Sequence, residues 1–180
     1  MYFEPEQLYH IFNRGNDKQK IFFTRDNYYY FLEKVKQGLL THCEILAYCL
    51  MPNHFHLLVS TKLKLNNKKF ISSIAHLLSS YARGIQIQEN ITGSLFQKKT
   101  RAKCLTLSTD GSMDPDEYYP LICFNYIHQN PFKAGLVKKM SPLTGDHPKG
   151  WEEWEFSSFN DYLDLTERTF LRYSIGSIIT

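Results

Sequence analysis

The apolar and polar positions of this chain predict short strands that alternate with longer helices. Three runs have the length and apolar character of strands, namely residues 8–12, 44–50 and 54–60. Turn-forming residues at 13–17 close the first run. Pro52-Asn53 between the second and third predicts a tight hairpin. The first sixty residues therefore predict three strands of a sheet. A turn follows the first strand, and a hairpin joins the second to the third.

Two longer segments have the apolar spacing of amphipathic helices. Residues 25–40 place apolar side chains three and four apart, with Thr24 or Asp26 as candidate N-caps. Residues 68–88 repeat the pattern over a longer stretch. Each of these helices is expected to bury one face against the sheet.

The second half of the chain is less regular. Residues 94–97 predict another strand that runs on toward 103–105, and residues 110–115 predict a loop. A third helix is expected from about 116 to 129. We predict that it stops at Asn130-Pro131, because the residue before a proline disfavours helical geometry.

The order β-α-β-β-α-β, followed by a further helix, predicts an α+β fold. We expect a ferredoxin-like or RRM-like split βαβ sandwich, with a central antiparallel sheet and helices packed on it. The strand at 54–60 should be one of the two central strands. The length of 180 residues favours one domain over residues 1–180, with a less regular C-terminal extension from about 140. This architecture hosts many functions, so it identifies none.

The composition is typical of a folded protein, and its positive and negative charges are segregated along the chain. The formal charge is only +3, but basic residues gather in two clusters and acidic residues gather at 110–117 and 152–164. Such segregation favours a cationic face for phosphates, although solvated lysines on an ordinary surface fit equally well. The 12 tyrosines and 13 phenylalanines are either core residues or stacking surfaces for bases. The basic clusters are Lys62, Lys64, Lys68 and Lys69, and Lys98, Lys99, Arg101 and Lys103.

Cysteine spacing and hydropathy indicate the cellular compartment in which we expect the protein. The four cysteines form no CxxC pair, so a reduced protein is expected and a cysteine-rich zinc site is not. No charged-then-apolar leader precedes the first strand, and no run reaches the length of a membrane span. We therefore expect a cytoplasmic protein without a membrane partner.

The candidate chemistry begins with two histidines on one strand. His54 and His56 are two residues apart, so their imidazoles should lie side by side on one face, with Phe55 on the other. Neutral imidazole is a common ligand of divalent metals. A histidine pair on a strand is nevertheless more often structural, and two ligands do not complete a site.

The third predicted helix offers two further groups. Tyr126 and Asn130 are four residues apart and can share a helix face. A phenol can attack a phosphodiester as a nucleophile, and a carboxamide oxygen is a hard metal ligand. The alternatives are a core tyrosine and an asparagine that caps the helix end. His128 falls on a different face and is not expected to be a ligand, while the role of His10 on the first strand stays open.

Several segments together resemble the single-tyrosine HUH transposases, and particularly their REP-associated tyrosine transposase branch. The similar segments occur in the family's order and span roughly residues 8 to 162. They are Tyr9-His10 with residues 13–16, residues 47–58, residues 93–97, residues 126–131 with 133–137, and residues 154–159. The histidine pair alone would be a weak match, and the combination makes it a strong one.

The resemblance implies an enzyme that cuts single-stranded DNA with Mg²⁺ or Mn²⁺ and needs no nucleotide cofactor. Cleavage would leave a 5′-phosphotyrosine and a free 3′-hydroxyl, which can later rejoin strands. Carried over by position, Tyr126 is the nucleophile, and His54, His56 and Asn130 hold the metal. The family often has glutamine at this position and the REP-associated branch has asparagine, which suits Asn130. The family also recognises DNA hairpins beside the cleavage site.

The resemblance extends to partners and location. It implies single-stranded or hairpin DNA as the partner, in a bacterial cytoplasm and at the nucleoid during action. A homodimer that completes the site in trans and a monomer that works in cis both occur among relatives, and the sequence fits either. Candidate DNA-backbone contacts are Arg14, Lys98, Lys99, Arg101 and Lys103.

Two stretches depart from the family pattern, and one other function class remains open. Residues 109–119 and 145–153 look expanded, which bears on DNA selection or dimerisation more than on chemistry. The alternative function is a non-catalytic, RRM-like nucleic-acid-binding module whose aromatics stack bases and whose histidines are structural. The discriminating features are Tyr126 and Asn130, because a pure binding module needs neither beside the histidine strand.

Overall fold

The computed structural model describes residues 1–106, 119–137 and 154–163. The predicted loop at 110–115 and the expanded stretch 145–153 lie outside the described residues. So do the acidic cluster at 110–117, the part of the third helix expected before residue 119 and most of the predicted C-terminal extension.

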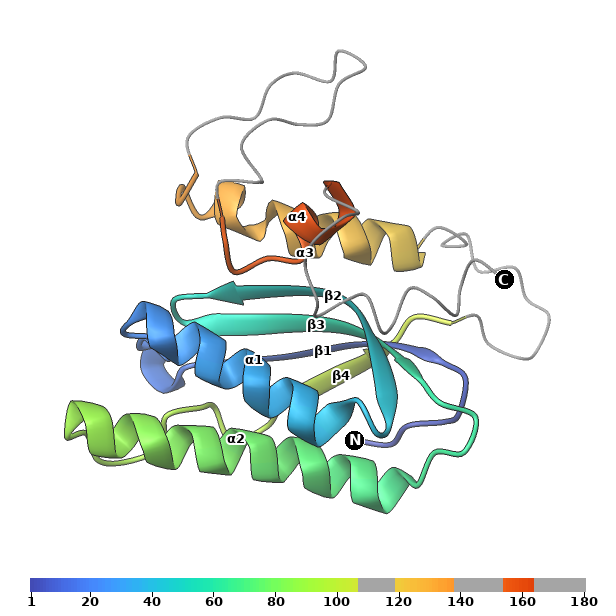
Figure 1. Ribbon diagram of the computed structural model, residues 1–180, viewed down its shortest axis with the longest axis horizontal. Helices are drawn as coiled ribbons and strands as arrows, with labels where there is room; N and C mark the ends of the chain where they lie inside the picture. The colour runs from blue at the N-terminus through green and yellow to red at the C-terminus, as the bar shows by residue number, and fades with distance from the viewer. Residues whose placement is uncertain (107–118, 138–153, 164–180) are drawn as a thin grey trace, which may run out of the picture.

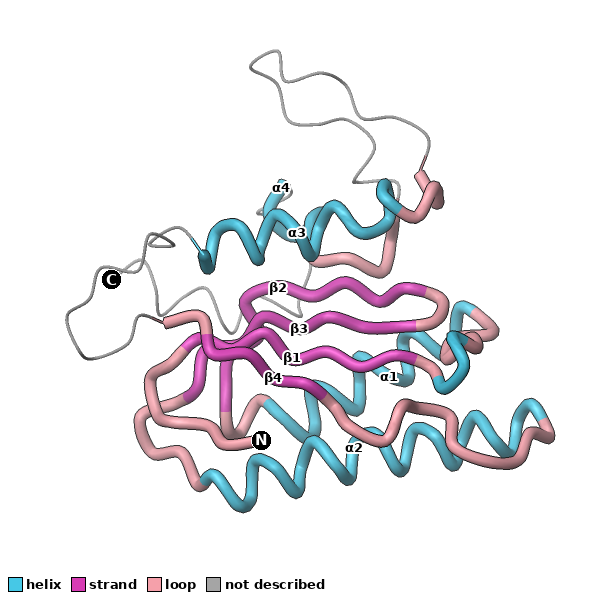
Figure 2. The backbone as a smooth tube through the Cα atoms, turned by 180° about the vertical axis from the view of Figure 1, so that it is seen from behind, coloured by secondary structure: helices cyan, strands magenta, loops and turns pink. Residues whose placement is uncertain are grey.

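Four strands form one antiparallel sheet in the order β2-β3-β1-β4 (Figure 2). They are β1 (Leu8–Arg14), β2 (Cys43–Met51), β3 (His54–Thr61) and β4 (Arg101–Cys104). This is the strand order of a split βαβ sandwich, so the predicted fold is confirmed. β3 and β1 occupy the centre, where backbone hydrogen bonds on both sides hold their side chains in place.

Helices cover both faces of the sheet (Figure 1). α1 (Arg25–Leu39) and α2 (Asn67–Glu89) lie on one face, and α3 (Tyr119–Lys133) and the short α4 (Phe159–Leu163) lie on the other. A single 3-10 turn, η1 (Asn16–Lys18), follows β1. We call the two sides of the sheet the α1/α2 face and the α3 face.

Side-chain alternation sorts the apolar residues between the two faces. On β3, Phe55, Leu57 and Val59 enter the large core under α1 and α2, whereas Leu58 joins a smaller cluster under α3. The large core is aromatic, and Tyr81 within it donates its hydroxyl to the Ile21 carbonyl oxygen at 2.7 Å. Burial of each large apolar side chain stabilises the fold by about 1.5–3 kcal/mol, so most of the stability resides on the α1/α2 face.

Side-chain hydrogen bonds mark where the first two helices begin. The Thr24 backbone N–H donates to Asn27 Oδ1 at 3.0 Å, so Thr24 is the N-cap and Asp26 lies inside the first turn. Asn66 Oδ1 accepts from the Lys69 N–H at 3.0 Å at the start of α2. Both predicted helices are confirmed to within one residue at each end.

The strand predicted at 94–97 is wrong. β4 begins only at Arg101, and the preceding segment pairs with the sheet backbone through an isolated bridge between Gly15 and Phe96. Leu95 and Phe96 are both buried in the large core, although they are neighbours in sequence. A strand would send them to opposite faces, so burying both requires an irregular backbone there.

The predicted end of the third helix is also wrong, because α3 continues through Pro131 to Lys133. A proline at 131 has no N–H to give to the Ile127 carbonyl oxygen. The side-chain amide of Asn130 donates instead, to the carbonyl oxygens of Ile127 at 3.3 Å and of Tyr126 at 2.8 Å. Asn130 therefore supplies the donor that the proline removes, and the helix continues.

The segment 154–158 protects the outer edge of β2. The Ser158 N–H donates to the Tyr48 carbonyl oxygen at 3.0 Å, and the Leu50 N–H donates to that of Phe156 at 2.9 Å. The Trp154 indole N–H donates to the Leu50 carbonyl oxygen at 3.0 Å. An uncovered edge strand invites pairing with other chains, so this segment closes that edge.

Candidate active site

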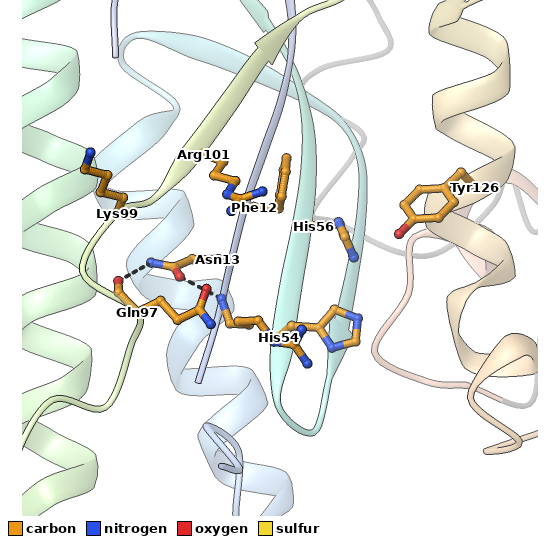
Figure 3. Close-up of a pocket in the computed structure, with 9 residues that line it drawn as sticks. Phe12, Asn13, His54, His56, Gln97, Lys99, Arg101 and Tyr126 are labelled. Carbon is orange, nitrogen blue, oxygen red and sulfur yellow. Dashed lines mark hydrogen bonds between the residues drawn. The ribbon is translucent and has the colours of Figure 1, made fainter. Parts of the chain in front are cut away.

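The two histidines of β3 stand together on the α3 face, as predicted. Their ring centroids are 5.0 Å apart and the ring planes are nearly perpendicular, at 86°. They line a pocket of about 350 Å³ whose other walls come from β1, β4 and α3, and include Arg14, Arg101 and Tyr126 (Figure 3). The β1–β3 register sets Arg14, which also lines this pocket, opposite His54.

His56 has one ring nitrogen occupied and one without a partner. Its Nδ1 is 2.8 Å from His10 Nε2, in a buried hydrogen bond between β3 and β1. Its Nε2 is buried, and no described residue gives it a hydrogen bond. A buried polar atom without a partner is costly unless it has another use, and metal ligation is one such use.

His54 is held in a comparable way by two asparagines. Its Nδ1 donates to Asn53 Oδ1 at 2.6 Å, which leaves Nε2 as the ring's acceptor. Asn130 approaches the same ring and raises its pKa by hydrogen bonding. Because Asn130 Nδ2 is used by helix carbonyls, its oxygen faces the ring, and that oxygen can accept a hydrogen bond only from the protonated imidazole. A carboxamide oxygen that favours a protonated imidazole also favours a metal cation.

Burial keeps the imidazoles of this face neutral at pH 7. Desolvation lowers the pKa of His56 well below its usual range, and neighbouring His10 and His54 lower it further. Desolvation, with help from the Lys103 charge, lowers the pKa of His10 to about 4. Burial also lowers the pKa of His54, against the opposing effect of Asn130. Neutral imidazole is the ligand form, so these rings are ready to bind a cation without losing a proton first.

Tyr126 lies above the histidine pair in the same chain. Its ring centroid is 5.5 Å from that of His56 and 6.2 Å from that of His10, and Figure 3 shows its hydroxyl turned toward His54 and His56. Its neighbour Ile127 packs into the small cluster under α3, which seats the helix on the sheet. The side chain of Tyr126 is 41 % exposed, so the phenol is accessible rather than part of the core.

These residues offer a divalent metal ion a donor set that differs from a cysteine or carboxylate cluster. Among the residues that the structure describes, no group of three or more His, Cys, Asp or Glu side chains could hold a metal. The unpartnered Nε2 of His56, the acceptor nitrogen of His54 and the Asn130 oxygen form a different donor set. Two nitrogens with a hard oxygen suit a first-row divalent ion or magnesium with open positions for water and substrate.

Comparison with known proteins gives the family. The family described as "Transposase IS200 like" matches residues 5–107, which is more than half of the 180-residue chain. The chain belongs to the IS200-like transposase family. The matched residues include His54 and His56 and end before Tyr126. The resemblance to single-tyrosine HUH transposases is confirmed, and the protein is a DNA transposase of this type.

A solved structure with the same fold supports the architecture of this IS200-like transposase. The structure of a REP-associated tyrosine transposase bound to a REP hairpin superposes with a TM-score of 0.63 and 16% identity, covering 94% of this chain and 92% of that one. At this identity the likeness shows the fold. A structure assigned as a transposase of Deinococcus radiodurans R1 has a TM-score of 0.43 at 18% identity and covers 71% and 92% of the two chains, too remote to support an argument. A comparison with curated proteins found no match.

The predicted DNA-contact residues of the transposase divide into three groups. Arg14, Lys99 and Arg101 line the pocket beside the histidines. Lys98 lines an adjoining groove between α2 and residues 94–100. Lys103 is directed elsewhere, because its ammonium donates to Tyr119 Oη at 2.6 Å and stands 3.9 Å from the centre of that ring.

Sequence reasoning left one residue of the site without a role. His10 is buried against His56, and its ring stacks on Phe12 with centroids 4.7 Å apart. Alternation along β1 predicts that His10 shares a face with Phe12. It does not predict the pairing of β1 with β3, which brings His10 to His56. His128 points away from the pocket, as expected, and its Nε2 is 2.8 Å from Ser158 Oγ.

No membrane-crossing helix occurs in this transposase within residues 1–106, 119–137 and 154–163, where every helix is too short or too polar to span a bilayer.

Proposed function

We propose that this transposase is a metal-dependent single-stranded DNA endonuclease and strand transferase that cuts beside DNA hairpins through a 5′-phosphotyrosine. The observation that carries the proposal is the Tyr126 hydroxyl, which faces the His54 and His56 imidazoles of its own chain across a cation-walled pocket. Nucleophile and metal-binding groups thus meet within one chain. We accordingly propose that cleavage occurs in cis and that a homodimer is not required for it.

The proposed step exchanges one phosphoester for another. Tyr126 Oη attacks the phosphorus, its proton passes to solvent, and the bond to the 3′ oxygen breaks to release a 3′-hydroxyl. A bound Mg²⁺ or Mn²⁺ ion, held by His54, His56 and Asn130, would supply Lewis-acid stabilisation of the phosphoryl charge. The 5′-phosphotyrosine conserves the ester, so a second 3′-hydroxyl can displace the tyrosine and rejoin the strand.

The cations of the pocket are placed to hold the phosphates of such a strand. Arg14 has a buried Nε for which no described residue provides a hydrogen-bond partner, and it lies opposite His54. A guanidinium with free donors matches the oxygen pairs of a phosphate. Arg101 pairs with Phe12 across β1 and β4, on the same face. We assign Arg14 to the scissile phosphate and Arg101 to a neighbouring one.

The pocket also opens toward a path for the flanking nucleotides. A groove of about 790 Å³ runs between α2 and residues 94–100, and it shares Asn13, Gln97 and Lys99 with the histidine pocket. Its floor is the apolar side of α2 and its rim carries Lys98. An apolar floor suits unpaired bases, and a cationic rim suits their phosphates. We propose that the single strand leaves the site along this groove.

Hairpin recognition is the finer part of the proposal. The solved structure with the same fold is a REP-associated tyrosine transposase bound to a REP hairpin. The sequence segments at residues 8–16, 47–58, 93–97, 126–137 and 154–159, including the Asn130 position, resemble that branch most. On these two grounds we propose a hairpin-bearing single strand as the substrate and the REP-associated branch as the protein's place in the family.

The binding-module alternative fits the architecture less well. RRM-like modules stack bases on an open sheet face. Here α3 covers the corresponding face, and its residues Cys123 and Ile127 pack against β2 and β3. The remaining opening is a pocket rather than a platform.

A covalent-adduct assay tests the proposal. The protein is incubated with a library of hairpin-bearing single-stranded DNAs and Mn²⁺, then denatured and resolved by size. We expect an adduct that chelation by EDTA prevents, and mass spectrometry should place the nucleotide on Tyr126. Tyr126→Phe should give no adduct, because it removes only the nucleophilic oxygen.

A matched control uses a tyrosine of equal exposure on the other side of the protein. Tyr30 on α1 is 42 % exposed, and Tyr30→Phe should form as much adduct as wild type. Wild type that binds hairpins without forming an adduct would replace this proposal with the binding-module reading. Undiminished adduct from Tyr126→Phe would show that the nucleophile is another residue.

A further inference from the structure

We infer that His10 is a positioning residue that keeps His56 in the tautomer able to bind the metal. This inference rests on the proposed function, because it concerns the ligand set of the same site. His10 touches neither the pocket's open volume nor the proposed phosphate position. It acts on the ligand set through its hydrogen bond to His56 from the neighbouring strand, and its ring also lies edge-on to Tyr126 with centroids 6.2 Å apart.

The contact is specific and shielded from water. His10 Nε2 and His56 Nδ1 are 2.8 Å apart, and the two rings have centroids 5.0 Å apart and planes 27° from parallel. Both side chains are less than a tenth exposed. Phe12 stacks on His10 and also lies 5.8 Å from the His56 ring, which narrows the space in which the His10 ring can turn. His10 is therefore a fixed partner for one nitrogen of His56.

The direction of this hydrogen bond decides what His56 can do. If His10 donated, His56 would carry its own proton on Nε2, a buried donor for which no described residue offers an acceptor. Leaving a buried donor unsatisfied costs about 1–3 kcal/mol. If His56 Nδ1–H donates to His10 Nε2, the proton is satisfied and Nε2 presents a lone pair to the pocket. His56 Nε2 has no partner among the described residues in either arrangement, but only the second leaves it a lone pair that a metal ion can take, so the second is the ligand tautomer.

His54, the other histidine of the pair, is oriented by an equivalent hydrogen bond. His54 Nδ1 donates to Asn53 Oδ1 at 2.6 Å, which also leaves Nε2 as the acceptor. Both imidazoles thus have their Nδ1 proton engaged from outside the pocket, one by a neighbour in sequence and one by a neighbour in the sheet. Orienting partners of this kind commonly change metal affinity by about 10–100-fold when removed.

Two substitutions of His10 separate positioning from packing. His10→Phe keeps a flat ring in the stack but removes the acceptor. His10→Gln retains an acceptor, because its Oε1 lies at about the reach of the imidazole Nε2. Mn²⁺ affinity, measured on the protein alone by electron paramagnetic resonance, should fall about 10–100-fold in His10→Phe and stay within about threefold of wild type in His10→Gln. His42→Phe, on the α1/α2 side of the protein, is the control and should not change it.

The tautomer itself is read by long-range ¹H–¹⁵N correlation of the metal-free protein at neutral pH. Wild type and His10→Gln should show His56 protonated at Nδ1, and His10→Phe should show protonation moving to Nε2. This signature does not move if His10 merely fills space.

The outcomes distinguish the inference from the proposed function. Wild type that fails to bind Mn²⁺ would remove the metal site, and this inference with it. Wild type that binds Mn²⁺ while His56 is protonated at Nε2, or that loses no affinity in His10→Phe, would overturn the inference and leave the metal site standing. If His10→Phe does not fold, the wild-type tautomer and His10→Gln still decide the question.

Discussion

The two faces of the sheet are made by the same strands and serve opposite purposes. On the α1/α2 face, Phe31, Phe55 and Tyr81 pack ring against ring, with centroids 5.0 Å apart for Phe31 with each of the others. On the α3 face, imidazoles occupy the equivalent alternate positions, and polar atoms such as His56 Nε2 and Arg14 Nε are buried without a partner among the described residues. Among the described residues, the buried side-chain polar atoms of the α1/α2 face all have partners, whereas the α3 face leaves binding capacity unused.

The contrast indicates where the protein can be changed without losing its fold. A closed aromatic core loses stability with every methylene removed. A face that retains unsatisfied donors and ligands has already given up stability for binding. Substitutions on the α3 face should therefore affect chemistry more than folding, and substitutions on the α1/α2 face should do the reverse. Four experiments test this division.

The largest effect is expected at a proposed ligand. His54→Ala should abolish DNA cleavage, because the metal loses one of its two imidazoles, while hairpin binding by electrophoretic mobility shift stays close to wild type. His76 on α2 is exposed, and His76→Ala is the control for loss of a histidine. Cleavage retained by His54→Ala would remove His54 from the ligand set.

The converse experiment is made in the aromatic core. Phe31 is fully buried on α1, and Phe31→Ala should lower the free energy of unfolding by about 3–5 kcal/mol through cavity formation, as measured by urea denaturation. The cleavage rate of the folded fraction should not change. If that rate falls as far as it does in His54→Ala, the two faces are not separable and the comparison fails.

A smaller effect is expected where the site and the helix share a residue. Asn130→Asp removes the donor to the Tyr126 and Ile127 carbonyl oxygens, and should cost about 1–3 kcal/mol in urea denaturation. Mn²⁺ should restore part of this, since a carboxylate is also a hard ligand.

A double-mutant cycle isolates the cause. Pro131→Ala returns a backbone N–H to the helix, so Asn130→Asp should cost less in that background than in wild type. Equal costs in both backgrounds would show that Asn130 does not substitute for the missing donor of Pro131.

The smallest effect concerns a single phosphate contact. Arg101→Ala should weaken binding of single-stranded DNA uniformly across sequences and reduce the slope of log affinity against log salt by about 0.7. Lys36 is exposed on α1, and Lys36→Ala should leave the slope unchanged. An unchanged slope in Arg101→Ala would place the DNA path elsewhere.

Local pattern was sufficient for most of the fold. The helical spacing over 25–40 and 68–88 and the Pro52-Asn53 hairpin all became the expected elements, because each depends on neighbours within one or two turns. The errors fall where a distant contact outweighs local preference. Leu95 and Phe96 leave strand geometry to enter a core built by α2, and Pro131 remains helical because a side chain replaces its donor.

The sequence by itself determined the chemical groups and which of them share a face. Period-two alternation puts His54 with His56, and helical spacing puts Tyr126 near Asn130, since both follow from backbone geometry alone. Only the tertiary structure decided which groups meet. The pairing of β1 with β3 brings His10 to His56, and the seating of α3 on the sheet brings the tyrosine over the histidines. These contacts join residues 46 and 70 positions apart (10 to 56 and 56 to 126), a distance that local propensities cannot span.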